Sequence, residues 1–149
     1  MEKTAERFAP MFMHMYATLG ALSKAFYERY GEEALPIIAR VAANSGVGIA
    51  RIIQKMGPVR NMKDLGEILK MWETMRFASE LIELTNNTIH FKVPKCPLGL
   101  EGTTRELCEA MMSSDSKMVS TLLEQEVEAK ILKSIAAGDK YCEVKYSTK

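Results

Sequence analysis

Apolar residues in the first half of the chain recur every three or four positions, which is the spacing of one helix face. The first stripe stops near Gly31, a residue that suits the left-handed cap of a helix. A second stripe lies between Ala34 and Met56, and a third follows Asn61, a good N-cap residue. The first stripe comprises Phe8, Phe12, Met15, Leu19, Leu22 and Phe26, and the third comprises Leu65, Ile68, Leu69, Trp72 and Met75. The pattern therefore predicts a mainly helical segment over residues 1–76.

Two glycines lie in the middle of the second stripe. Gly46 and Gly48 each weaken a helix by about 1 kcal/mol relative to alanine. Either the helix breaks there, or another element packs tightly against the bare backbone. Pro36 is tolerable only if the helix begins just before it, because the proline ring removes an amide donor.

The hydrophobic period changes from helical to alternating between Glu80 and Val93. β-Branched and aromatic residues alternate there around Asn86 and Asn87, a pair that tolerates positive φ. This pattern predicts a β-hairpin. The closing run KYCEVKY also alternates and predicts a further strand.

Two helices are expected between the hairpin and the last strand. Thr103 and Glu106 form a capping-box pattern for a short helix, which ends before the run SSDS. A longer helix is expected from about Met118 to Ala137 because four apolar residues there are spaced by four. They are Leu123, Val127, Ile131 and Ile135. Residues 80–149 then have the order strand, strand, helix, helix, strand.

Together these elements predict one α+β domain over residues 1–149. A helical N-terminal half joins a small three-stranded antiparallel sheet, which two further helices cover. The length is that of a single domain with a substantial core.

Composition narrows the classes of partner. The net charge of +1 gives no electrostatic basis for binding nucleic acid. The apolar run over residues 8–22 contains Pro10 and His14 and follows a charged segment, so we expect neither a signal peptide nor a membrane span.

Three cysteines cannot all pair, which favours reduced thiols and a complete, cytoplasmic protein. The eleven methionines are typical of an adaptable core or an apolar pocket, and the exposed methionine-rich helices are compatible with a homodimer.

Cys96, Cys108 and Cys142 are the residues most able to carry chemistry. Their spacing matches no close-spaced zinc motif. A hairpin strand and the last strand of one small sheet can be neighbours, and the intervening helix must pack on that sheet, so the three sulfur atoms can converge. Three interpretations stay open: small buried hydrophobic residues, a reactive thiol, or a metal site.

Polar residues near these cysteines supply further candidates. Asp115 lies seven residues after Cys108, two turns along one helix face if the helix is continuous. It is a candidate base, or it opens the next helix, where a carboxylate favours the positive end of the dipole. The first turn of the Thr103 helix, with Lys95 and Arg105 nearby in sequence, is either an ordinary cap or a site for a small carboxylate.

The chain has two histidines, His14 and His90, so a His-rich metal site is excluded. His90 lies on the polar face of its strand. We expect it to be exposed or hydrogen-bonded rather than a ligand or a base.

Three short motifs occur in order in the C-terminal half: KCPLG, ELCEAMMSSD and AAGDKYCEVKY. They resemble the Cys-Pro pair, the cysteine followed by an aspartate, and the closing Gly-Asp-x-x-Cys of the L-2-amino-thiazoline-4-carboxylic acid hydrolase (aminothiazoline-carboxylate hydrolase) family. The segment FYERYGEEALPIIARVAANSGVGIARII is similar to the N-terminal helices of that family. The ending also resembles vinyl-4-reductase-type (4VR) small-molecule-binding domains, which often bind zinc through several cysteines and a glutamate. Ala137 before the glycine, and the lack of a cysteine between Cys108 and Cys142, depart from that metal set.

The first resemblance implies a hydrolase that opens a thiazoline-like cyclic amidine to an N-carbamoyl-cysteine-type product. The catalytic residues that it implies are Cys96, Cys108, Asp115 and Cys142, with Asp115 as base and Cys108 as acid or nucleophile. The implied substrate-binding residues are Arg105, Lys95 and Thr103. No cofactor is expected, with zinc on the three cysteines as the alternative. The second resemblance implies a non-catalytic small-molecule-binding or sensor domain.

Overall fold

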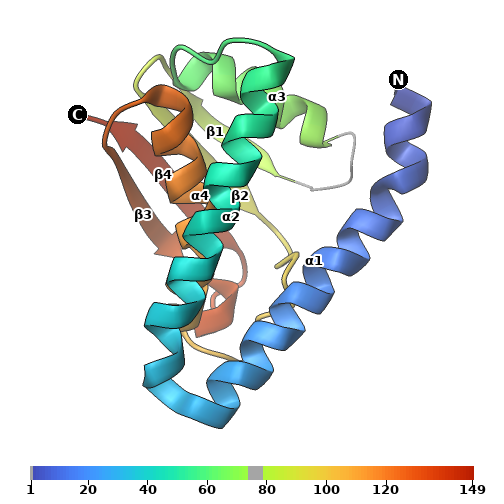
Figure 1. The fold of residues 1–149 in the computed structure, drawn as a ribbon, viewed down its shortest axis with the longest axis vertical. Coiled ribbons are helices and arrows are strands. Elements are labelled where there is room, and N and C mark those ends of the chain that lie inside the picture. The colour runs from blue at the N-terminus through green and yellow to red at the C-terminus, as the bar shows by residue number, and fades with distance from the viewer. Residues whose placement is uncertain (1, 74–78) are drawn as a thin grey trace.

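A computed structural model describes residues 2–73 and 79–149, in which helices pack on one face of an antiparallel sheet (Figure 1). Its helices are α1 (Glu2–Tyr30), α2 (Ala34–Met56), α3 (Met62–Glu73) and α4 (Arg105–Leu123), with short 3₁₀ turns η1 (Gly31–Glu33) and η2 (Ile135–Ala137). Its strands are β1 (Glu80–Leu84), β2 (Thr88–Val93), β3 (Val127–Lys133) and β4 (Cys142–Thr148). The α+β class and the helical N-terminal half are confirmed.

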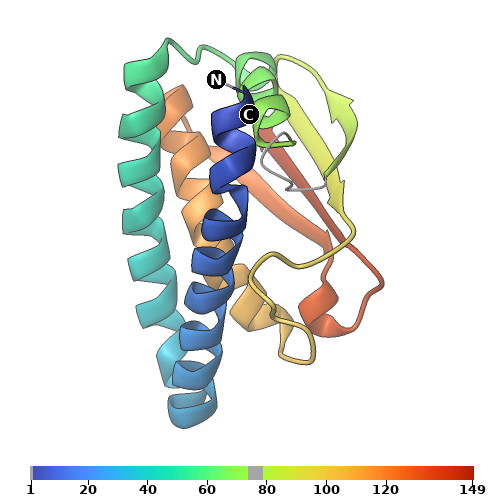
Figure 2. The same cartoon turned by 90° about the vertical axis from the view of Figure 1, so that its right-hand side faces the viewer.

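The sheet has the strand order β1-β2-β4-β3, and each neighbouring pair is antiparallel. Its inner face buries Ile89, Val144 and Tyr146 against α4, which lies between the sheet and α2 (Figure 2). Both edge strands carry a β-bulge, between Leu81 and Glu83 in β1 and between Ile131 and Lys133 in β3.

The predicted helix from Met118 to Ala137 is wrong. Helix α4 continues through the SSDS run to Leu123, and β3 follows it, so the sheet has four strands rather than three. A spacing of four fits both periods, because residues four apart share a face in a helix and also in a strand. Val127 and Ile131 therefore lie on one face of β3.

The structure decides whether helix α2 breaks at its two glycines or packs tightly there. The helix is continuous from Ala34 to Met56, and Gly46 is buried against α4. A Cβ atom at Gly46 would overlap the carbonyl oxygen of Ser114, whereas a Cβ atom at Gly48 would meet nothing within 4 Å. Tight backbone packing at Gly46 is therefore the correct interpretation.

The expected turns and caps are mostly in place. Gly31 has a left-handed φ of 63° after α1, and Asn61 Oδ1 accepts a hydrogen bond of 3.0 Å from Asp64 N at the start of α3. The cap of α4 is Thr104, whose Oγ1 accepts a hydrogen bond of 3.2 Å from Leu107 N, so the prediction of Thr103 was one residue early. Met75 lies outside the described residues.

Helix α1 runs along the side of the domain, and its N-terminal half diverges from α2 (Figure 1). Its inward face buries Ala9 and Gly20, and Gly20 packs on the backbone of Leu98. The helical region Glu6–Met56 includes a stretch whose length and composition would allow it to cross a membrane, but core helices and signal sequences pass that test too.

Candidate functional site

The fold brings the three cysteines together at one end of the sheet. Cys96 follows β2, Cys108 lies in the first turns of α4, and Cys142 begins β4 opposite Val93. All three belong to one apolar cluster, in which Cys96 and Cys108 are buried and Cys142 is half-buried. The convergence expected from the sequence is thus present.

The surroundings of the cysteines favour neutral thiols. Burial raises the pKa of Cys108 and of Cys142, and the neighbouring cysteines add to both shifts. Two of the sulfur atoms accept backbone hydrogen bonds: Leu100 N donates to Cys96 Sγ at 3.5 Å, and Ile135 N donates to Cys142 Sγ at 3.3 Å. These hydrogen bonds hold Cys96 Sγ and Cys142 Sγ in place within the apolar cluster.

As they lie in the structure, the three cysteines do not form a metal site. Within residues 2–73 and 79–149, no three Cys, His, Asp or Glu side chains are arranged to hold one. Ser134, rather than a further metal-binding side chain, lies beside Cys108. The roles of Cys96, Cys108 and Cys142 in catalysis or in zinc binding stay predictions.

We expect the thiols of the native protein to react slowly with Ellman's reagent at pH 7. Raised pKa values leave little thiolate, and burial limits access to the sulfur atoms. Denaturant should expose all three thiols and accelerate the reaction at least about tenfold. Rapid reaction of Cys108 in the native protein would contradict this expectation and would support a nucleophilic role.

A second polar cluster lies farther along α4, between α1 and the sheet. Burial raises the pKa of Tyr16 of α1 and of Tyr146 of β4, and the charge of Asp115 of α4 adds to both shifts, so the three side chains lie near one another. We call the region around these three side chains the α1–α4 seam. The Asp115 side chain keeps some contact with solvent, yet burial raises the pKa of its carboxyl group to about 6.

Tyr146 is the least satisfied polar residue of the seam. Its side chain is 2% exposed, and its hydroxyl group makes no hydrogen bond to any described residue. Ser116 lies beside it, without hydrogen-bond geometry. Burial, followed by the charge of Asp115, holds the pKa of Tyr146 well above its usual value. An unpaired hydroxyl group beside a carboxyl group is therefore buried in apolar surroundings.

The predicted substrate-binding residues have structural contacts or lie on the surface. Arg105 Nη1 donates a hydrogen bond of 2.7 Å to Ile131 O, which joins α4 to β3. Thr103 Oγ1 donates a hydrogen bond of 2.6 Å to Leu100 O, and Lys95 is exposed. Their role in binding a carboxylate stays a prediction.

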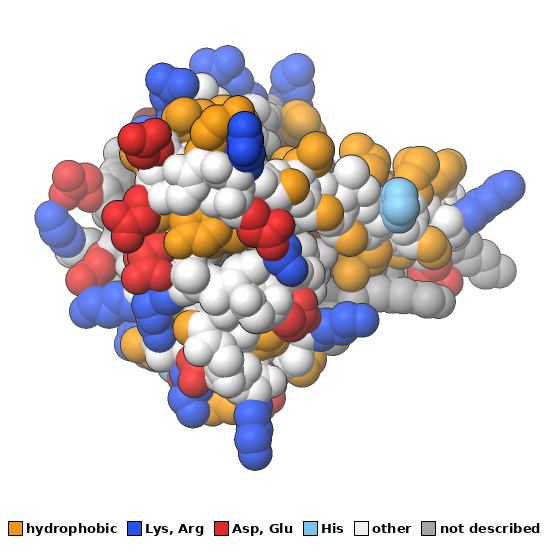
Figure 3. Space-filling model, turned by 90° about the horizontal axis from the view of Figure 1, so that it is seen from below, with side chains coloured by type: hydrophobic (Ala, Val, Ile, Leu, Met, Phe, Trp, Pro, Cys, Tyr) orange, Lys and Arg blue, Asp and Glu red, His pale blue; other side chains and the backbone are white. Residues whose placement is uncertain are grey.

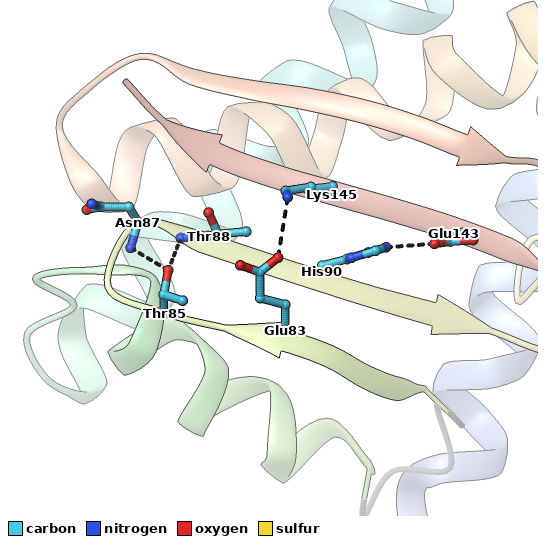
Figure 4. Close-up of polar contacts among 7 residues, drawn as sticks. All are labelled: Glu83, Thr85, Asn87, Thr88, His90, Glu143 and Lys145. Atoms are coloured by element: carbon cyan, nitrogen blue, oxygen red, sulfur yellow. Dashed lines mark hydrogen bonds and ion pairs between the residues drawn. The ribbon is translucent and has the colours of Figure 1, made fainter.

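His90 lies on the outer face of the sheet, as expected from the alternation of β2. Its Nε2 atom lies 2.8 Å from Glu143 Oε1 on β4, and Lys145 Nζ lies 3.3 Å from Glu83 Oε2 (Figure 4). These cross-strand pairs cover the face away from the seam. His90 therefore has a hydrogen-bond partner and is remote from the cysteines' face.

Two surface depressions lie elsewhere. One of about 640 Å³ lies between the N-terminal ends of α2 and α4, where Glu32, Glu106 and Glu109 line it. Another of about 350 Å³ lies between α2 and α3, beside Arg60 and Asp64. Neither depression contains a predicted site residue, and both are open to solvent.

Sequence reasoning missed Tyr16 and Tyr146. Tyr146 could have been found, because residues 142, 144 and 146 share one face of an alternating strand and Cys142 was already a candidate. Tyr16 had no such signal, since its place depends on how α1 packs along the side of the domain.

Neither a protein-family model nor a curated protein matches the sequence. Solved structures do match. The phenol-responsive sensory domain of the transcription activator PoxR, solved with phenol, has a TM-score of 0.63 and 19% identity, covering 89% of this chain and 74% of that chain. Trafficking protein particle complex subunit 3 from Naegleria fowleri, covalently bound to palmitic acid, has a TM-score of 0.61 and 15% identity, covering 100% of this chain and 97% of that chain. This chain has the fold of both proteins.

The two resemblances noted in the sequence fare differently. No family model supports the aminothiazoline-carboxylate hydrolase family. The resemblance to small-molecule-binding domains agrees with the fold, because one structural neighbour is a small-molecule sensory domain.

Proposed function

We propose that this chain is a small-molecule-binding or sensor domain whose ligand occupies the α1–α4 seam. The observation that carries the proposal is the buried, unpaired hydroxyl group of Tyr146 beside Asp115. Buried polar groups in native proteins nearly always have a partner, so an unpaired one favours an absent ligand or water. Ligand pockets are mostly apolar, with a few polar groups that fix orientation.

The side chains around the seam suit one class of ligand. The Phe91 ring stacks near the Tyr146 ring, with 6.1 Å between centroids, and Met112 packs against both apolar clusters. An apolar molecule with one hydroxyl or carboxyl group would bury its body here and pair that group with Tyr146 or Asp115. Phenol and palmitic acid, found with the two structural neighbours, are both molecules of this kind.

Entry of a ligand requires α1 to move outward. The seam is closed on one side by α1, which buries Ala9 and Gly20 but leaves much of its surface exposed. The close backbone contact of Gly20 with Leu98 makes a pivot near the middle of α1. Displacement of the N-terminal half about this pivot opens the seam and gives a sensor its conformational response.

Calorimetric titration with phenol and with palmitic acid tests the proposal. We expect at least one of them to bind, and Tyr146→Phe to weaken its affinity about tenfold through the loss of one hydrogen bond. Tyr141→Phe is the matched control, because Tyr141 contacts Lys92 and Lys133 away from the seam. Equal affinity of the two variants, or no binding of either compound, would overturn the proposed site.

Hydrolysis is a second candidate function, favoured by one observation. A carboxyl group with a pKa of about 6 is close to what a general base needs near neutral pH. Incubation with aminothiazoline carboxylate, with detection of the released thiol, tests it. Equal product release by the wild type and Asp115→Asn would contradict the role of Asp115 as base, and no release by the wild type would leave the binding function alone.

A further inference from the structure

Helix α1 has a second apolar face that points away from the domain. Its members are 40–65% exposed, and none of them packs into a core cluster. They are Phe8, Met11, Phe12, Met15, Leu19 and Leu22, which we call the α1 stripe. At 100° per residue, the stripe spans about 100° of the helix surface. Figure 3 shows apolar side chains gathered along the part of the molecule that projects from the domain.

The surroundings of the α1 stripe are free of charge. No Lys, Arg, Asp or Glu occurs between residues 8 and 23, and the exposed residues Ala17 and Ala21, on other sides of the helix, are uncharged too. The six side chains expose about 550 Å² of apolar surface, taking a full side-chain area of roughly 180 Å². A patch of this size is at the upper end for a monomer, where patches are about 300–600 Å². It supplies most of the roughly 800 Å² per partner of a standard interface.

The spacing of the α1 stripe indicates what covers it. Positions 8, 11, 15, 19 and 22 are symmetric about Met15, because Phe8 and Leu22 lie seven residues from it and Met11 and Leu19 lie four. Two copies of such a helix, antiparallel about a two-fold axis at Met15, place these five residues opposite their symmetric counterparts, whereas Phe12, the sixth residue of the stripe, lies opposite Thr18. A two-fold interface requires this self-complementarity, whereas a different protein or a lipid surface does not.

We infer that the α1 stripe is the interface of a homodimer, in which α1 of each copy packs antiparallel on α1 of the other with the two-fold axis at Met15. The inference is independent of the ligand proposed for the seam, because the stripe and the inward face of α1 are different sides of the helix. It also assigns the exposed Met11 and Met15 a partner, since unbranched thioether side chains fill irregular gaps between helices.

Sedimentation velocity at micromolar concentrations tests the state of association. We expect a dimer for the wild type and a monomer for Met15→Glu, since the axis places the two glutamates against each other. Ala17→Glu is the matched control, because Ala17 is exposed on the side of α1 opposite the stripe, and this variant should remain a dimer. Mixing Met15→Glu with Met15→Lys chains should restore the dimer through a pair of opposite charges.

Disulfide trapping tests the register. Met15→Cys should form a covalent dimer with itself under mild oxidation. Phe8→Cys should not cross-link with itself but should do so with Leu22→Cys chains. Cross-linking of Phe8→Cys with itself would indicate a parallel pair and would overturn the inferred geometry.

Two other results would overturn the inference. A wild type that is monomeric at 100 µM, or a dimer that Met15→Glu leaves intact, would show that a second copy does not cover the stripe. Flotation with phosphatidylcholine vesicles separates the membrane alternative: binding of the wild-type monomer that Met15→Glu abolishes would assign the stripe to a lipid surface.

Discussion

Replacement of Gly46 by alanine should lower the free energy of unfolding by about 3 kcal/mol. The new Cβ atom would overlap the carbonyl oxygen of Ser114, so α2 and α4 must separate. Because both partners at this contact are helix backbone, no side-chain rotation relieves the overlap. Much of the core between α2 and α4 depends on this approach, since Ala50, Ile53 and Met118 pack in the same cluster. Urea denaturation followed by circular dichroism measures the change.

Gly48→Ala is the matched control for this experiment. It adds the same methyl group two residues away in the same helix, where a Cβ atom meets nothing within 4 Å. We expect it to raise the free energy of unfolding by about 0.5–1 kcal/mol, the helix propensity difference between glycine and alanine. Equal effects of the two substitutions would contradict the packing described for Gly46.

Replacement of Asp115 by asparagine should stabilise the protein at pH 7.5. Burial raises the carboxyl pKa from an ordinary value of 3.8 to about 6 in the folded state, so ionisation opposes folding above that range. The full shift corresponds to roughly 3 kcal/mol, and the remaining solvent contact of the side chain reduces the expected gain to about 2 kcal/mol. Denaturation of the wild type and the variant at several pH values measures this gain in the free energy of unfolding.

The contribution of Asp115 to the free energy of unfolding changes with pH, and the raised pKa decides its direction. With its folded pKa raised, Asp115 contributes stability below about pH 4, and this contribution is lost as the pH rises through 6. The difference between the wild type and Asp115→Asn should therefore grow between pH 4 and 6 and then level off. Asp64→Asn is the opposite case, because hydrogen bonds from Arg60 lower the pKa of Asp64 and its loss should destabilise the protein above pH 4. A flat difference for Asp115→Asn would contradict its burial.

The sequence alone predicts those elements whose local signals agree with the fold. The stripes of α1 and α2, the left-handed Gly31, the Asn61 cap and the hairpin at Asn86 all follow from periods and turn chemistry that act within a few residues. The glycine pair in α2 left two alternatives, and the choice between them depended on α4, which is far away in sequence.

Strand β3 was missed for a local reason. Its residues keep a spacing of four that a helix shares, and the end of α4 has no glycine to mark it. Glu124 takes the left-handed conformation there, with φ 52°. Glycine usually fills this position, so the sequence carries no stop signal before β3.

The site was predictable only in part. The convergence of Cys96, Cys108 and Cys142 follows from strand adjacency, which the sequence supports. The meeting of Tyr16, Asp115 and Tyr146 depends on how α1 crosses the side of the domain, which brings together residues about a hundred positions apart or more. No periodicity within one element encodes such a crossing.

The bulges in β1 and β3 bear on how this protein avoids aggregation. The pairing register of each outermost strand shifts once, and charged residues such as Glu83 and Lys133 lie at the shift. An incoming strand from another molecule would find a twisted, charged border rather than a flat ladder of free backbone groups. Open-ended fibril growth along the sheet is thereby disfavoured, which leaves the helical side as the route to closed assemblies.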